Sequence, residues 1–224
     1  MTRTTSARIA GVAFLFYIAA GLAAVVLFGR ATGAEGAALL ARVAGHAPEV
    51  RLAAVLTLLC SFAALVLGVT LYGITRDEDH ELAVLAMTFR VAEGVLGGFS
   101  VIPMLGLLWL GTAGGASGPD AAAAHALAAY LLKGEDASPT VTATFFAVGS
   151  TLFSWLLLRG RMVPVPLAWL GVAASVLLVV GLPLRLGGVV GGPLFELVWL
   201  PMLVFEVTLA AWFLTRGVAT PAAR

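Results

Sequence analysis

The sequence contains no asparagine and no glutamine, so its polar side chains are hydroxyls, ionisable groups and aromatic hydrogen-bond donors. Charge is scarce too, because Asp, Glu, Lys and Arg make up only 11% of the 224 residues and the formal net charge is +1. Such a chain has no basic face for nucleic acid, and we expect no nucleic-acid partner. Its single cysteine, Cys60, excludes an intrachain disulfide and leaves the redox compartment open.

Apolar side chains dominate what is present, at 61% of the residues and a mean hydropathy of +1.04. This composition lies far outside the range of soluble domains. Six apolar runs are long enough to cross a bilayer. The sequence therefore predicts an all-α fold, a polytopic transmembrane helix bundle that forms a single domain. The expected spans cover residues 9–28, 51–74, 82–111, 141–158, 164–184 and 194–215.

The first apolar run could also be a cleaved signal peptide, because Arg3 and Arg8 precede it and residues 31–34 resemble a cleavage site. Its length of about twenty residues exceeds the usual 7 to 15 of a signal peptide's apolar region, and five more spans follow. We therefore interpret it as the first span. Within later spans, Pro103 and Pro201 predict a kink or break, since proline removes a helical hydrogen bond.

Two longer loops, residues 30–49 and 112–139, are expected to lie on the outer face and to carry a short helix each. In the first, residues 35–43 have helical spacing and Gly45 is a plausible stop. In the second, residues 117–120 resemble a capping box that opens a helix through Lys133, closed by Gly134. The acidic turn at residues 76–81 is expected to serve the helix dipole that follows it.

Six spans place both termini on one side of the membrane, and the positive-inside rule makes that side cytoplasmic, by a modest margin. The basic residues on that side are Arg3, Arg8, Arg76, Arg159, Arg161, Arg216 and Arg224. Those on the other side are Arg30, Arg42, Arg51, Lys133 and Arg185. Membrane lipids are the expected surroundings, and the oligomeric state is left open.

Ionisable residues inside the spans mark the candidate site, because a charge within the membrane is costly unless it is paired or hydrated. Arg90 and Glu93 share a stripe of the third span with Gly94 and Gly97, whereas the opposite face is wholly apolar. Counted from the cytoplasmic ends, Arg90 and Glu206 lie about 12–13 Å deep. We expect Arg90 to contact Glu206, with Glu93 either completing the pair or kept protonated by burial.

A second, shallower polar set is expected near the outer face. It consists of Arg51, Arg185 and Glu196, with His46 or His125 from the loops. The histidines have no ligand motif of metal-site spacing, so we expect no metal site and no cofactor. No histidine lies within a span, which disfavours an intramembrane Ser–His protease.

The last third of the chain carries two recognisable stretches, Leu-Arg-Gly-Arg-Met-Val-Pro-Val-Pro-Leu-Ala-Trp-Leu-Gly at 158–171 and Phe-Glu-Val-Thr-Leu-Ala-Ala-Trp-Phe-Leu-Thr-Arg-Gly at 205–217. They resemble the bacterial six-helix membrane family catalogued as domain of unknown function 4386. Arg51, Tyr72 and Phe89-Arg-Val-Ala-Glu93 resemble its earlier landmarks, and Val165 departs from it where a basic residue is common. The resemblance implies a six-helix protein of the bacterial cytoplasmic (inner) membrane, with no activity attached.

Three functions fit these residues. The leading hypothesis is binding or translocation of a small amphipathic or apolar, lipid-soluble molecule, coupled to protons through Glu93 or Glu206 if it is transported. The second is a membrane-embedded cyclase or isomerase whose buried glutamate is the acid. The third is a structural or accessory subunit in which the charges only join helices. Whether the protein is an enzyme is left open at this stage.

Overall fold

The computed structural model describes residues 2–34, 38–113, 120–192 and 195–219. Every regular element in these residues is a helix, and six helical segments are long and apolar enough to cross a membrane. The predicted all-α polytopic bundle is therefore confirmed. In chain order the helices are α1 (Arg3–Thr32), α2 (Ala38–Gly45), α3 (Ala47–Thr75), α4 (His80–Phe99), α5 (Val101–Thr112), α6 (Ala121–Arg159), α7 (Val165–Leu186), the 3-10 helix η1 (Phe195–Val198) and α8 (Trp199–Thr215).

Side-chain caps fix three of the helix starts. The hydroxyl of Thr2 accepts the backbone N–H of Thr5 at the start of α1, and the carboxylate of Asp79 accepts that of Leu82 at the start of α4. Asp120 likewise accepts the N–H of Ala123 at 2.8 Å and opens α6. These bonds satisfy backbone donors that the first helical turn leaves unpaired. The start of α6 at Asp120 agrees with the helix start that the sequence predicts there. Residue 117, the other member of the expected capping box, lies outside the described residues.

Both expected proline breaks are present. The third span divides at Ser100 into α4 and α5, one turn before Pro103. The sixth span begins as the 3-10 helix η1 and becomes α-helical at Trp199, two residues before Pro201. In each case proline cannot donate the hydrogen bond that would hold the preceding turn in regular α-helix. The breaks fall in the helices that carry the buried charges.

The second outer loop differs from the sequence-based expectation. No separate loop helix ends at Gly134, because α6 runs without interruption for 39 residues and includes both Gly134 and Pro139. Most of the expected loop 112–139 is therefore helical, because α6 already begins at Ala121. The expected loop 30–49 is also shorter than predicted, because α1 continues through Thr32. A single proline or glycine weakens a helix without ending it when neighbouring helices pack along its length. The short helix expected in the first loop is present as α2.

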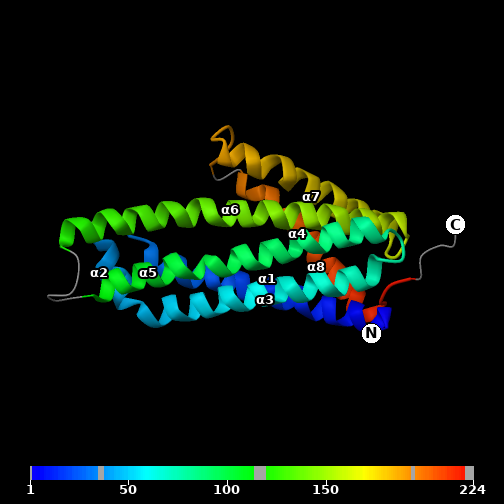
Figure 1. Ribbon diagram of the computed structural model, residues 1–224, viewed down its shortest axis with the longest axis horizontal. Coiled ribbons are helices and arrows are strands. Elements are labelled where there is room, and N and C mark those ends of the chain that lie inside the picture. The colour runs from blue at the N-terminus through cyan, green and yellow to red at the C-terminus, as the bar shows by residue number, and fades with distance from the viewer. Residues whose placement is uncertain (1, 35–37, 114–119, 193–194, 220–224) are drawn as a thin grey trace.

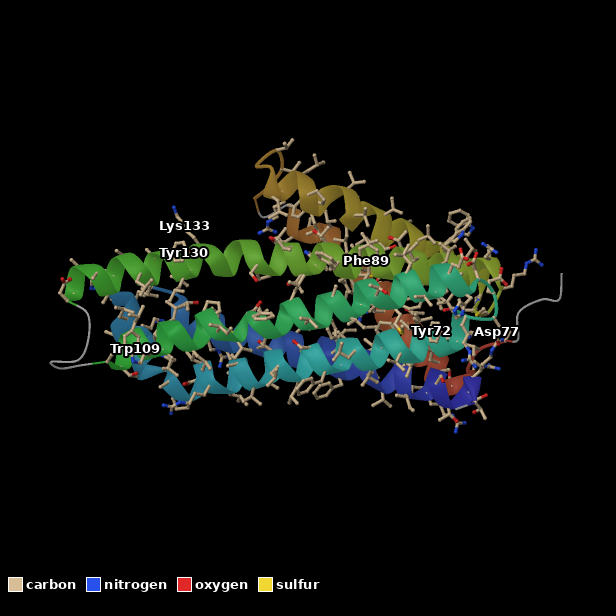
Figure 2. The ribbon with its side chains drawn as sticks, viewed as in Figure 1. Tyr72, Asp77, Phe89, Trp109, Tyr130 and Lys133 are labelled. Carbon is tan, nitrogen blue, oxygen red and sulfur yellow. The ribbon has the colours of Figure 1, made fainter. Side chains whose placement is uncertain are left out.

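The helices differ in length, and this difference shapes the molecule (Figure 1). At about 1.5 Å per residue, α6 is roughly 58 Å long and α7 roughly 33 Å, so of these two helices it is α7 that matches a hydrocarbon layer of about 30 Å. Figure 1 shows α7 and α8 beside one part of α6, near the start of α1, whereas α2 and α5 lie at the other end. Tyr130 and Lys133 stand on the part of α6 that extends beyond α7 (Figure 2). With this part, α6 is longer than one hydrocarbon layer requires.

The buried apolar side chains of the described residues form three clusters, of which the two larger ones follow from this arrangement. The larger joins α1, α3, α4, α6, α7 and α8, and its largest members include Phe153, Phe205 and Phe213. The smaller joins α2 and α5 with the extended part of α6, around Val43 and Leu107. Ion pairs close the end of the bundle where α1 starts: Arg159 lies 2.9 Å from Glu78 and 3.2 Å from Asp79, and Arg3 lies 2.7 Å from Asp77. The acidic turn thus pairs with arginines and caps α4.

Candidate functional site

The polar stripe of α4 faces the inside of the bundle, as its periodicity predicts. The side chains of Arg90 and Glu93 are only 1% and 2% exposed, and Gly94 is buried beside them. On the opposite face, Phe99 is 60% exposed and Val95 51%. An apolar exposed face suits acyl chains, while two ionisable groups inside the bundle require partners there.

Glycines on two neighbouring helices make room for the stem of Arg90. A Cβ atom added to Gly68 of α3 would lie 3.1 Å from the Cβ of Arg90, and one added to Gly149 of α6 would lie 3.3 Å from its Cγ and Cδ. The guanidinium carbon of Arg90 then lies 5.0 Å from the ring centroid of Phe146 and 5.7 Å from that of Tyr17. Both distances allow cation–π attraction, which is stronger where water is excluded.

Glu93 receives two contacts. Nη1 of Arg90 lies 2.8 Å from its Oε2, and the hydroxyl of Tyr17 donates a hydrogen bond to its Oε1 at 2.8 Å. The contact with Arg90 is an ion pair by distance, but the two groups are not aligned for a hydrogen bond, so the three guanidinium nitrogens and Oε2 of Glu93 have no hydrogen-bond partner among the described residues. Arg90 and Glu93 are therefore paired electrostatically, and Tyr17 fixes the carboxylate from α1.

Glu206 of α8 lies close to this pair but is not part of it. Its side chain is buried, lines the same cavity as Glu93, and is near enough to Arg90 and Glu93 to interact with both electrostatically. The expected contact between Arg90 and Glu206 does not reach ion-pair distance, because no ion pair of the described residues includes Glu206. Arg90 does pair with Glu93, which was expected either to complete the pair or to be kept protonated. Arg90 pairs with Glu93 because residues at i and i+3 lie on the same face of a helix, which brings these two side chains of α4 together.

A cavity of about 630 Å³ adjoins the two glutamates. Three of the surrounding helices line it with residues three or four positions apart: Tyr17 and Gly21 of α1, Cys60 and Ala64 of α3, and Met202 and Glu206 of α8. The volume is that of an ordinary small-molecule site, and the walls are mostly apolar. Further lining residues come from α4, α5, α6 and η1: Glu93, Gly94, Gly97, Ser100, Met104, Pro139, Thr142, Ala143, Phe146 and Glu196.

The cavity opens sideways between α1 and α8. Leu22 and Val25 of α1 line it although they are 58% and 71% exposed, and Leu203 of α8 lines it at 37% exposed. Nearer the ends where the chain starts and stops, the same two helices are in close contact, since a Cβ added to Gly11 would lie 2.8 Å from Leu214. The opening therefore lies on faces of the spans that carry apolar side chains, where a lipid-soluble molecule could enter from the bilayer.

Three buried oxygen atoms of cavity-lining residues have no hydrogen-bond partner among the described residues. Oε2 of Glu93 lies within ion-pair distance of Arg90, whereas Oε1 of Glu206 and Oγ1 of Thr142 have neither a hydrogen bond nor an ion pair there. Other hydroxyls there are satisfied. Ser61 donates to the carbonyl of Thr57 in its own helix, as expected for serine in a span, and the hydroxyl of Ser100 lies 3.3 Å from that of Ser138. Buried polar atoms normally have partners, so the oxygens of Glu206 and Thr142 are positions where a bound molecule would gain hydrogen bonds.

Several residues of this site were missed by the sequence-based reasoning. Tyr17, Phe146 and Cys60 surround the charges, yet none was singled out. A signal existed only for Tyr17, which lies in the middle of its span, whereas tyrosine in membrane proteins favours the interfaces. The contributions of Phe146 and Cys60 depend on how α6 and α3 are rotated, which single-span periodicity in almost uniformly apolar helices does not determine.

The expected outer polar set is divided in the structure. Arg185 and Glu196 form an ion pair at 2.7 Å, and the guanidinium of Arg185 lies 5.4 Å from the ring centroid of Phe195. No hydrogen bond or ion pair given by the described residues joins His46, Arg51 or His125 to that pair, and Nδ1 of His46 lies 3.0 Å from the carbonyl of Arg42 instead. The reason is the short α7, which ends part-way along α6, whereas α3 and α6 start at the far end (Figure 1).

The two C-terminal stretches have clear packing roles. At Gly171 of α7 the helices α6 and α8 both come close, since a Cβ there would overlap the ring of Phe205 and lie 2.6 Å from Oγ of Ser154. Gly217 follows α8 with a φ of 71°, a conformation that glycine adopts without strain. Arg159 of the basic turn binds the acidic turn before α4. These residues fix the helices around the cavity.

A family model described as Domain of unknown function (DUF4386) matches residues 9–217, which is nearly the whole chain. No curated protein and no solved structure matches it. The match contributes no activity, so the chemistry of the site has to come from its geometry.

Proposed function

The chain belongs to the family described as Domain of unknown function (DUF4386), and because membership assigns no activity, we propose from the geometry that it binds a small, lipid-soluble amphipathic molecule. The observation that carries this proposal is the cavity of about 630 Å³ between α1 and α8, with apolar walls and carboxyl groups at its inner side. A pocket of this kind holds an apolar body by burial and orients it by a few polar groups.

The direction of entry supports the same function. A water-soluble ligand would need a polar entrance, but the exposed lining residues of α1 and α8 are Leu22, Val25 and Leu203. The exposed lining carboxylate of Glu196 in η1 is already paired with Arg185. A ligand that partitions into the bilayer would reach the cavity directly between these helices. Its apolar part would contact the side chains of α1, α3 and α8, and its polar end would lie near Glu93 and Glu206. Transport of such a molecule, with a proton carried by one of the glutamates, would be an extension of this binding.

Photolabelling tests the proposal. The protein is reconstituted into liposomes with a long-chain alcohol that carries a diazirine, and labelled peptides are located by mass spectrometry after irradiation. We expect label on the cavity faces of α1 and α8, and less of it in Gly21→Leu, because Gly21 lines the cavity and an added Cβ has only the sulfur of Cys60 near it, at 3.9 Å. Gly29→Leu is the matched control, since a Cβ at Gly29 of the same helix meets nothing within 4 Å and Gly29 does not line the cavity. Equal labelling of the two variants would contradict the proposal.

A membrane-embedded enzyme is the second candidate, and one observation favours it. Oε1 of Glu206 is buried at an apolar cavity with no hydrogen-bond partner among the described residues, so this carboxyl group is available to exchange a proton with a bound substrate. This function predicts a changed lipid product in membranes that contain the protein, absent with Glu206→Gln. Unchanged lipid composition, measured by mass spectrometry, would exclude it in favour of binding alone.

We further propose that the protein lies in the bacterial inner membrane with both termini in the cytoplasm. The start of α1 and the end of α8 lie at the same end of the bundle (Figure 1), where Arg3 and Arg159 also lie, and the positive-inside rule favours this end as the cytoplasmic one. In that orientation the extended part of α6, with α2, would face outward.

A further inference from the structure

The charges around the cavity are unbalanced. The titratable side chains among its described lining residues are Tyr17, Cys60, Glu93, Glu196 and Glu206, so three are carboxyl groups and none is a base. Glu93 and Glu196 each have an arginine partner, at 2.8 and 2.7 Å. Glu206 has none within an ion-pair distance in the part of the chain that the structure describes.

The inner cluster therefore carries a net charge of one negative unit when its groups are ionised. Arg90 contributes one positive charge, Glu93 and Glu206 contribute one negative charge each, and Arg90 is already engaged by Glu93. Arg90 is not among the cavity-lining residues, so a ligand in the cavity meets the carboxyl groups and not the guanidinium. A buried carboxylate is costly unless a cation or hydrogen-bond donors compensate it.

From this arrangement we infer that the ligand's polar end is a cation: the cavity takes an amphipathic amine whose ammonium group pairs with Glu206. The inference rests on the proposed function and adds the chemical class of the ligand to it. An ammonium group offers hydrogen-bond donors only, which matches the unpartnered oxygens of Glu206 and Thr142. The rings of Trp199 and Phe146 line the same cavity, and aromatic faces attract cations. An anionic end would instead meet two glutamates.

Three probes with one apolar body and different ends test the inference: pyrenemethylamine, pyrenemethanol and pyrenecarboxylic acid. Binding to the full chain in lipid nanodiscs is followed by pyrene fluorescence at neutral pH. For the wild-type protein we expect the amine to bind about tenfold or more tighter than the alcohol, and the acid to bind most weakly. This comparison needs no variant, so it does not depend on whether a variant folds.

Variants then locate the preference. Glu206→Gln should bring the amine and the alcohol to similar affinity, because the amide keeps the shape and removes the charge. Glu81→Gln is the matched control: it makes the same change at an exposed glutamate of α4 that does not line the cavity, so the amine preference should persist.

The possible failures are distinguishable. If the wild-type protein binds amine and alcohol equally, or if Glu206→Gln keeps the preference, the ligand is not a cation held by Glu206, although binding in the cavity stands. If none of the three probes binds more tightly to the wild-type protein than to Gly21→Leu, both the inference and the proposed function are wrong.

Discussion

Replacing Arg90 by methionine removes the only cation of the buried cluster and leaves Glu93 without its partner. Because the two side chains are 1% and 2% exposed, solvent cannot take over the role of the guanidinium. Breaking a buried pair in this way typically costs about 3–5 kcal/mol, which lowers the folding equilibrium constant roughly 10²- to 10⁴-fold. The loss of the contacts to the rings of Phe146 and Tyr17 acts in the same direction.

The double variant Arg90→Met with Glu93→Leu separates the charge from the packing. Replacing both members of a buried pair by apolar groups is often neutral or stabilising, so much of the lost stability should return. The recovery is incomplete because the hydroxyl of Tyr17 loses its acceptor, which costs about 1–3 kcal/mol. The single variant is therefore expected to be less stable than the double variant.

Unfolding in a detergent titration, followed by tryptophan fluorescence, measures these free energies. The matched control is Arg185→Met, since Arg185 also forms an ion pair with a glutamate but at side-chain exposures of 37% and 57%. An exposed pair of this kind contributes about 0–1 kcal/mol. If Arg90→Met costs no more than Arg185→Met, or if the double variant is no more stable than the single one, the buried pair described above does not exist.

Three further predictions concern packing, access and orientation. Gly171→Ala should destabilise the protein by about 1–3 kcal/mol in the same titration because its Cβ would overlap the ring of Phe205, whereas Gly29→Ala, where nothing is near, should be neutral or stabilising; equal effects would refute the close packing of α7 on α8. Cys60 should react with N-ethylmaleimide more slowly in Gly21→Leu than in the wild-type protein, since the leucine would cover its sulfur, and an unchanged rate would place Cys60 away from the cavity. Reporter fusions at the chain start should be active only as cytoplasmic reporters, and reporters in the loop between α5 and α6 only as external ones; the reverse pattern would invert the proposed orientation.

The fold was largely predictable because hydrophobic length is a strong signal in a chain of this composition. Six spans, both proline breaks and the inward side of α4 follow from run length, from Pro103 and Pro201, and from the separation of Arg90 and Glu93 from the apolar face. What failed was the end of the loop helix at Gly134. Glycine weakens a helix locally, but packing against neighbouring helices stabilises it, and α6 therefore continues through Gly134.

The site was predictable only in part. The sequence indicates which charges lie inside the membrane, because each is an exception in an apolar run. It does not determine pairing between helices, so Arg90 was expected to contact Glu206, with Glu93 completing the pair or kept protonated. The ion pair that forms is the one with Glu93, one turn away on the same helix. The cavity could not be predicted either, because it arises where α1 and α8 meet at Gly11 but are farther apart near Leu22, and this depends on the relative tilt of two helices.

The most direct test of ligand binding in this cavity is a crystal of the protein soaked with a long-chain alkylamine that carries bromine, examined by anomalous scattering. A bromine peak between α1 and α8, beside the cavity-lining side chains and with the amine end at Glu206, is the predicted result. Bromine found only along the outer lipid-facing sides of the helices, with the cavity free of it, would contradict the account.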